Sequence, residues 1–199
     1  MSTQQAITRI ELGCGDNKRE GFYGLDIARS PVTDYVANFE KDPLPFPDDS
    51  IEQVYSNHTF EHLGYWPNIL REIVRVCKHD ALVEVWTPYG PSRDAFVIGH
   101  RLFLNESHWK HICFQHDRHY LGEAPGYLLW EETRYNLTPG ILQQLQSMHV
   151  PIGFAIEHMF DIAFEWGVFL RVKKDLPKAP GPQRPVRFFC YGRDKTLSI

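Results

Sequence analysis

Short apolar segments alternate with turns along the first half of the chain, and this alternation restricts the fold more than any other feature of the sequence. Five segments read as strands: Ala6–Leu12, Gly21–Ile27, Asp34–Phe39, Ile51–Asn57 and Ala81–Pro88. Between the last two, Ile69, Ile73 and Cys77 recur at helical spacing, with charged residues on the opposite side. Strands that alternate with crossovers in this way predict a parallel α/β sheet.

The connection between the first two predicted strands is shorter than the dozen or so residues that a helical crossover needs. We therefore expect its helix to be reduced to a turn or two. The connection between the second and third strands is similarly short, so the same reduction is expected there.

After Pro88 the sequence changes character. Residues 91–137 are rich in histidine and aromatic residues and read as an insertion after the fifth strand, with a short helix expected at Asn105–Cys113. A second helix is expected to follow, with Thr138 as its N-cap. Two late strands, Trp166–Lys174 and Val186–Asp194, flank a proline-rich segment and are predicted to form a long hairpin.

These elements predict a single domain over residues 1–199. Its sheet is expected to contain seven mostly parallel strands, with an antiparallel strand supplied by the last hairpin. Residues 138–199 would close the domain with a helix and this hairpin.

The composition is that of a globular protein. Hydrophobic residues make up 43% of the 199, but no apolar run approaches the roughly 18 residues of a membrane span. The net charge is −4 and no long basic run occurs, so nucleic acid is not an expected partner. The four cysteines form no C-x-x-C pair, which favours free thiols in a cytoplasmic protein.

The segment His58–His62 spells H-x-x-E-H, the spacing of inverted zinc metallopeptidases. That chemistry requires both histidines on one face of a helix and a further ligand downstream. The motif instead begins where the fourth predicted strand ends, and no later residue stands out as the missing ligand. We therefore interpret the H-x-x-E-H spacing as a coincidence in a protein of another fold, not as a metallopeptidase motif, and we predict no metal site.

A glycine-rich turn follows the first predicted strand, and an acidic residue ends the second. Gly13-Cys14-Gly15 would allow the backbone to approach a ligand closely at the carboxyl edge of the sheet. Asp26 could accept both hydrogen bonds of a ribose diol. The combination predicts a nucleoside-bearing ligand at this edge.

The segments IELGCG, GLDI, ANFEKDPLPFPDDS and SNHTFEHL together resemble the class I S-adenosylmethionine-dependent methyltransferases, especially a small bacterial type 11-like group. The resemblance covers roughly residues 7–90, and the first 90 residues would form the cofactor-binding half. It implies a Rossmann-like fold with S-adenosylmethionine as the cofactor. The chain departs from the family at Asn17, where a third glycine is usual, and at Asn38, where a carboxylate is usual.

The resemblance also implies the cofactor contacts. They come from Glu11, Gly13, Cys14 and Gly15 around the methionine part, Asp26 at the ribose, Asn38 and Phe39 at the adenine, and Asn57 and His58 beside the departing methyl.

Two roles remain open for the histidines. His62 is our candidate general base for a hydroxyl nucleophile, and the alternative is a histidine that only shapes the turn. In the insertion, His108/His111 and His116/His119 have metal-like spacing, but no carboxylate or cysteine completes a ligand set there.

We predict a methyltransferase that acts on a small-molecule or saccharide acceptor. The aromatic residues of the insertion, among them Trp109, Tyr120, Tyr127, Trp130 and Tyr135, would form a lid over the cleft or, alternatively, pack onto the sheet. The alternative function is a protein of the same fold that binds S-adenosylmethionine without catalysis. The sequence specifies neither the acceptor nor the oligomeric state.

Overall fold

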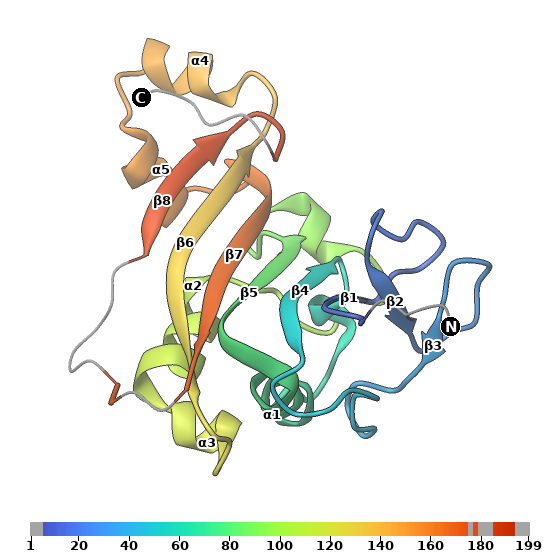
Figure 1. The fold of residues 1–199 in the computed structure, drawn as a ribbon. Coiled ribbons are helices and arrows are strands. Elements are labelled where there is room, and N and C mark those ends of the chain that lie inside the picture. The colour runs from blue at the N-terminus through green and yellow to red at the C-terminus, as the bar shows by residue number, and fades with distance from the viewer. Residues whose placement is uncertain (1–5, 175–176, 179–184, 194–199) are drawn as a thin grey trace.

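A computed structural model describes residues 6–174, 177–178 and 185–193 of the chain. Its centre is an eight-stranded sheet in the order β3-β2-β1-β4-β5-β7-β6-β8 (Figure 1). The strands are β1 Arg9–Leu12, β2 Tyr23–Asp26, β3 Tyr35–Val36, β4 Ile51–Asn57, β5 Cys77–Pro88, β6 Tyr127–Leu137, β7 Ala163–Lys173 and β8 Val186–Cys190. The first five are parallel, β7 runs antiparallel to β5 and β6, and β8 runs parallel to β6.

Helices cover one face of this sheet. The longest is α1, Pro67–Val76, whose residues Ile69, Leu70, Ile73 and Val74 are buried against the sheet because they fall on one helical face. The others are η1 Phe60–His62, η2 Arg93–Phe96, α2 Glu106–Lys110, the π-helical turn η3 His111–Gln115, α3 Asp117–Leu121, α4 Ile141–Ser147 and α5 Ile152–His158. In Figure 1, α1, α2 and α3 lie behind the sheet. Within the described residues, no helix has both the length and the apolar character needed to cross a membrane.

Within the described residues, arginine side chains and not helices cover part of the opposite face. The short connections were expected to keep a helix of a turn or two, and the structure has none there. No helix lies between β1 and β2 or between β2 and β3. Aromatic side chains of the strands are buried there beneath guanidinium groups: Arg19 lies 4.4 Å from the ring centre of Tyr55, Arg193 4.6 Å from that of Trp86, and Arg134 4.4 Å from that of Phe169. Flat guanidinium groups can cover aromatic faces while they still reach water.

The predicted fold class is confirmed, but the second half of the chain differs from the prediction. Residues 127–137 form the strand β6 of the sheet, so the segment between β5 and β6 is shorter than the expected insertion. Because β6 lies between β7 and β8, the two late strands do not form a hairpin, and the sheet has eight strands instead of seven. The helix α4 begins after Gly140, and the hydroxyl of Thr138 donates to the carbonyl of Asp161 instead of capping it.

The aromatic residues of the expected lid are mostly core residues. Trp109, Trp130 and Tyr135 are at most 2% exposed, and only Tyr120 and Tyr127 are partly buried at the edge of the core. Trp109 packs against Phe60 and Trp66 of the segment that follows β4. The packing alternative is therefore correct for the three buried rings.

Candidate active site

The glycine-rich turn lies at the carboxyl end of β1. The amides of Gly13 and Cys14 both donate to the carbonyl of Leu25, at 2.8 and 3.2 Å, which fastens the turn to β2. Gly13 has a φ of +74°, and a Cβ atom built there would lie 1.9 Å from Oγ1 of Thr59. Gly15 has a φ of +51° with no atom within 4 Å of such a Cβ. The turn is thus closed on the side of Thr59 and open at Gly15.

Asp26 faces the open side of this turn. Its Oδ2 accepts from the amide of Gly15 at 2.9 Å, and its Oδ1 accepts from the amide of Ala28 at 2.9 Å. An ionised carboxylate offers about four lone pairs, so each oxygen retains capacity for a further donor. The half-exposed carboxylate beside an open glycine turn fits a ribose diol.

Three of the predicted cofactor residues, Glu11, Cys14 and Phe39, are buried. Glu11 is 3% exposed, its carboxylate accepts from the amide of Arg19 at 2.5 Å, and burial raises its pKa. The Cys14 thiol is buried and lies 3.9 Å from the hydroxyl of Thr33, and burial raises its pKa as well. Phe39 belongs to the hydrophobic core. These side chains shape the loop, which leaves the open surface to backbone atoms and to Asp26.

Asn38 follows β3 in a tight turn. Its amide donates to Oδ2 of Asp42 at 2.8 Å, and its own Oδ1 accepts from the amide of Glu40 at 3.0 Å. The side chain is half-buried, and Oδ1 has a second lone pair that could accept from an adenine amino group.

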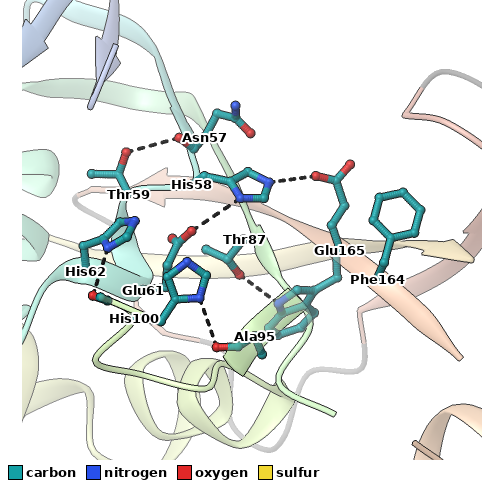
Figure 2. Close-up of polar contacts among 12 residues, drawn as sticks. Asn57, His58, Thr59, Glu61, His62, Thr87, Ala95, His100, Phe164 and Glu165 are labelled. Atoms are coloured by element: carbon teal, nitrogen blue, oxygen red, sulfur yellow. Dashed lines mark hydrogen bonds and ion pairs between the residues drawn. The ribbon is translucent and has the colours of Figure 1, made fainter. Parts of the chain in front are cut away.

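Asn57 and His58 mark the carboxyl end of β4. His58 has a φ of +52°, a left-handed conformation that ends the strand and turns the imidazole toward β7. Its Nε2 lies 3.0 Å from Oε2 of Glu165, and its Nδ1 lies 3.5 Å from Oε1 of Glu61 (Figure 2). The histidine is therefore held between two carboxylates.

Glu165 is the centre of a buried polar network that the sequence analysis did not identify. Arg193 donates to both of its oxygens, at 3.0 and 2.7 Å, and Asn136 donates to Oε1 at 2.5 Å. Burial by itself would raise the pKa of Glu165, but the hydrogen bonds from His58 and Arg193 outweigh it and lower the pKa to about 2. Glu165 is thus a carboxylate at neutral pH, and the Nε2–H of His58 donates to it.

Arg193 extends this network to the end of β4. Its Nη2 lies 2.6 Å from Oδ1 of Asn57, and its Nη1 lies 2.7 Å from the hydroxyl of Tyr55. No sequence pattern connected Arg193 or Glu165 with Asn57, because the three residues are brought together only by the pairing of β7 beside β5 and the return of the chain after β8.

The H-x-x-E-H segment does not have the geometry of a metallopeptidase helix. His58 is left-handed, and the 3-10 helix η1 starts only at Phe60, so the two histidines do not lie on one helical face. Glu61 and His62 instead approach His100, with one candidate ligand atom of each within 4.8 Å of the others. The sequence offered no sign of this arrangement, since His100 lies well beyond β5.

A polar groove of about 620 Å³ opens where the chain leaves β5. Tyr89, Glu106, Lys110 and Arg187 are among its lining residues. The hydroxyls of Tyr89 and Tyr135 donate to Glu106 at 3.0 and 2.6 Å, and burial together with this carboxylate raises the pKa of both phenols. The groove therefore presents fixed charges and ordered hydroxyl groups near the carboxyl edge of the sheet.

A family model described as a methyltransferase domain matches residues 11–85, which contain the glycine turn, Asp26 and the end of β4. This part of the chain is therefore similar to a methyltransferase domain. S-adenosylmethionine is the cofactor of that family. The search of curated proteins found no match.

Several solved structures share the overall fold of this chain. A methyltransferase of Archaeoglobus fulgidus described as SAM-dependent superposes with a TM-score of 0.55 at 14% identity, over 83% of this chain and 87% of that one. The YcgJ protein of Bacillus subtilis has a TM-score of 0.50 at 14% identity, over 86% and 95%. A Haloferax volcanii methyltransferase, solved in complex with the activator Trm112, has a TM-score of 0.51 at 16% identity, over 90% and 87%.

Proposed function

We propose that this chain is an S-adenosylmethionine-dependent methyltransferase that acts on a small-molecule or saccharide acceptor. The observation that carries the proposal is the open turn at Gly15 beside the Asp26 carboxylate, at the carboxyl edge of a sheet in the order described above. Ligands of open α/β sheets bind at this edge. The family match over residues 11–85 supports the same assignment.

S-adenosylmethionine supplies an electrophilic methyl group on its sulfonium. The residues of this chain bind and orient: Asp26 would accept from the ribose hydroxyls, Asn38 from the adenine amino group, and Asn57 and His58 would border the methionine part. Glu11, Cys14 and Phe39 would keep the turn in place.

Proton removal from a hydroxyl acceptor requires a basic nitrogen near the cleft. His62 remains our candidate. Its Nδ1 lies 3.1 Å from the carbonyl oxygen of Gly99, which can only accept, so Nδ1 carries the proton and Nε2 has the free lone pair. The side chain is exposed and can therefore meet an acceptor from solution.

The polar groove at Tyr89 is the proposed acceptor region. Its charged residues Lys110 and Arg187, together with Glu106, favour a hydroxylated or charged acceptor over an apolar one. The cytoplasmic location stays a prediction from the free cysteines, all four of which are buried.

Calorimetry with S-adenosylmethionine tests the cofactor assignment. Loss of the Asp26 carboxylate in Asp26→Ala should weaken binding by roughly 10- to 150-fold, as expected for hydrogen bonds to a charged group. Asp16→Ala is the matched control, because Asp16 lies in the same loop but is exposed and does not end a strand. Equal affinities of the two variants would contradict the assignment.

Turnover is measured separately, as release of S-adenosylhomocysteine with panels of small hydroxylated compounds and saccharides. The proposal expects turnover with a member of these classes. Tight binding of S-adenosylmethionine without turnover would instead support the non-catalytic alternative.

A further inference from the structure

Glu61 is a buried carboxylate without a hydrogen-bond partner. Its side chain is 1% exposed, and neither Oε1 nor Oε2 accepts a hydrogen bond from the described residues. Burial raises its pKa. Nδ1 of His58 lies 3.5 Å from Oε1 but makes no hydrogen bond with it. A buried carboxylate that accepts no hydrogen bond is costly, because buried charges are ordinarily hydrogen-bonded or bound to a metal. The position of Glu61 therefore calls for a cation or a proton beside it.

Two imidazoles face this carboxylate. Figure 2 shows Glu61 beside the rings of His62 and His100, whose centroids lie 4.9 Å apart. One ligand atom from each of the three residues lies within 4.8 Å of the others. A tetrahedral zinc ion with bonds of about 2.0–2.2 Å separates its ligand atoms by about 3.3 Å. An inward movement of the two imidazoles, of which His62 is exposed and His100 half-buried, would complete the set.

Each histidine is oriented by the nitrogen that points away from Glu61. Nδ1 of His62 lies 3.1 Å from the carbonyl oxygen of Gly99, and Nδ1 of His100 lies 3.0 Å from that of Ala95. Since carbonyl oxygens only accept, both Nδ1 atoms are protonated and both Nε2 atoms have free lone pairs. Metal-binding histidines typically have this second hydrogen bond, which fixes the tautomer and the ring.

The backbone holds the two segments together. The amides of Arg101 and Leu102 donate to the carbonyl oxygen of Glu61, at 2.8 and 3.1 Å. This attachment fixes the residue before Arg101, His100, against η1. The cluster is therefore built from a fixed backbone junction, two oriented imidazoles and one buried carboxylate.

We propose that Glu61, His62 and His100 bind a divalent transition-metal ion, with zinc as the expected ion. Two imidazole nitrogens and one carboxylate form a donor set that zinc uses in sites with an open position. His62 is exposed and His100 half-buried, so solvent or an acceptor group can reach the remaining position. The inference is independent of methyl transfer, because it concerns metal binding only. A metal-bound Nε2 of His62 could not act as the general base, so the two roles of this residue exclude each other.

The test is metal binding by the full-length chain after treatment with a chelator. Zinc is titrated by calorimetry, and cobalt is titrated by its visible absorption, which reports tetrahedral coordination. We expect one zinc ion per chain. His62→Ala and His100→Ala should each weaken binding by more than the roughly 10- to 100-fold typical of second-shell changes. Glu61→Gln, which preserves the shape of the side chain, should weaken it comparably.

The control is the double variant His111→Ala/His116→Ala. These two exposed histidines have ring centroids 5.1 Å apart, and each belongs to one of the two histidine pairs noted in the sequence of the insertion. Their loss should leave zinc affinity unchanged. Circular dichroism confirms that each variant is folded, which is expected for His62→Ala because the side chain is exposed. Absence of stoichiometric zinc binding would overturn the proposal, and so would binding that survives His62→Ala and His100→Ala or is lost only in the control.

Discussion

Replacement of Glu165 by glutamine isolates the charge at the centre of the buried network. Gln preserves the shape of the side chain and one acceptor oxygen, but it cannot balance the guanidinium of Arg193, which lies 2.7 Å from Oε2. The substitution also leaves the Nε2–H of His58 without its charged acceptor. Glu165→Gln should therefore destabilise the protein by leaving a positive charge half-buried.

The magnitude follows from the pKa. In the folded protein the pKa of Glu165 is about 2, against an ordinary value of 4.5. One pKa unit corresponds to about 1.4 kcal/mol, so the ionised carboxylate contributes about 3 kcal/mol to stability at pH 7. Because the folded-state pKa is lowered, this contribution is complete above pH 4.5 and is lost as the pH falls toward 2. At pH 3 we expect about 1.4 kcal/mol to remain.

Urea denaturation at pH 7 and pH 3 measures the difference in free energy of unfolding between the unaltered chain and Glu165→Gln. The other carboxyl groups are the same in both proteins, so their titration cancels in this difference. The matched control is Glu157→Gln, which removes the partner of Arg187 from a surface pair whose carboxylate is 52% exposed. Surface pairs contribute about 0–1 kcal/mol. Equal effects of the two substitutions, or a Glu165→Gln effect that does not shrink at pH 3, would refute the reasoning.

Two further predictions concern the turn and the core. Gly13→Ala should cost about 2–5 kcal/mol in urea denaturation, because its Cβ would meet Thr59 and its φ is positive, whereas Gly15→Ala should cost only about 1–2 kcal/mol for its backbone conformation. Similar losses for the two would contradict the assigned clash. Trp109→Ala should cost about 3–5 kcal/mol because the ring is 1% exposed, whereas Phe103→Ala, at 46% exposure, should cost much less. If Trp109→Ala has normal stability, the ring is not a core residue, and the alternative that it forms part of a lid over the cleft is favoured.

The first half of the fold could be predicted because its signals are local. The boundaries of β4 were predicted without error. The helical spacing of Ile69 and Ile73 identified α1, but Cys77, the last residue of that pattern, is the first residue of β5. The strand β6 was missed because its alternation is interrupted. Buried and partly exposed residues alternate up to Trp130 and again from Glu132, but the register shifts between these two residues, so no single period of two runs through the segment.

The site was predictable where a turn or strand end specifies it, and not where distant segments meet. Gly13 and Asp26 could be assigned from local geometry and from the family resemblance. Glu165 and Arg193 lie in the second half of the chain, and their approach to Asn57 depends on the strand order β4-β5-β7. Nothing in the sequence around either residue indicates that order.

The five letters from His58 to His62 show the same limit within one segment. If they formed an α-helix, the two histidines would share a face with Glu61 between them. The positive φ of His58 separates the residues instead: His58 turns toward Glu165, while Glu61 and His62 turn toward His100. The conformation of His58 is determined by tertiary contacts, since its amide donates to the carbonyl of Trp86 on the neighbouring strand at 2.9 Å. A single residue in a left-handed conformation thus prevents the letters of a helical zinc motif from forming one helical face, and His58 instead lies between Glu165 and Glu61.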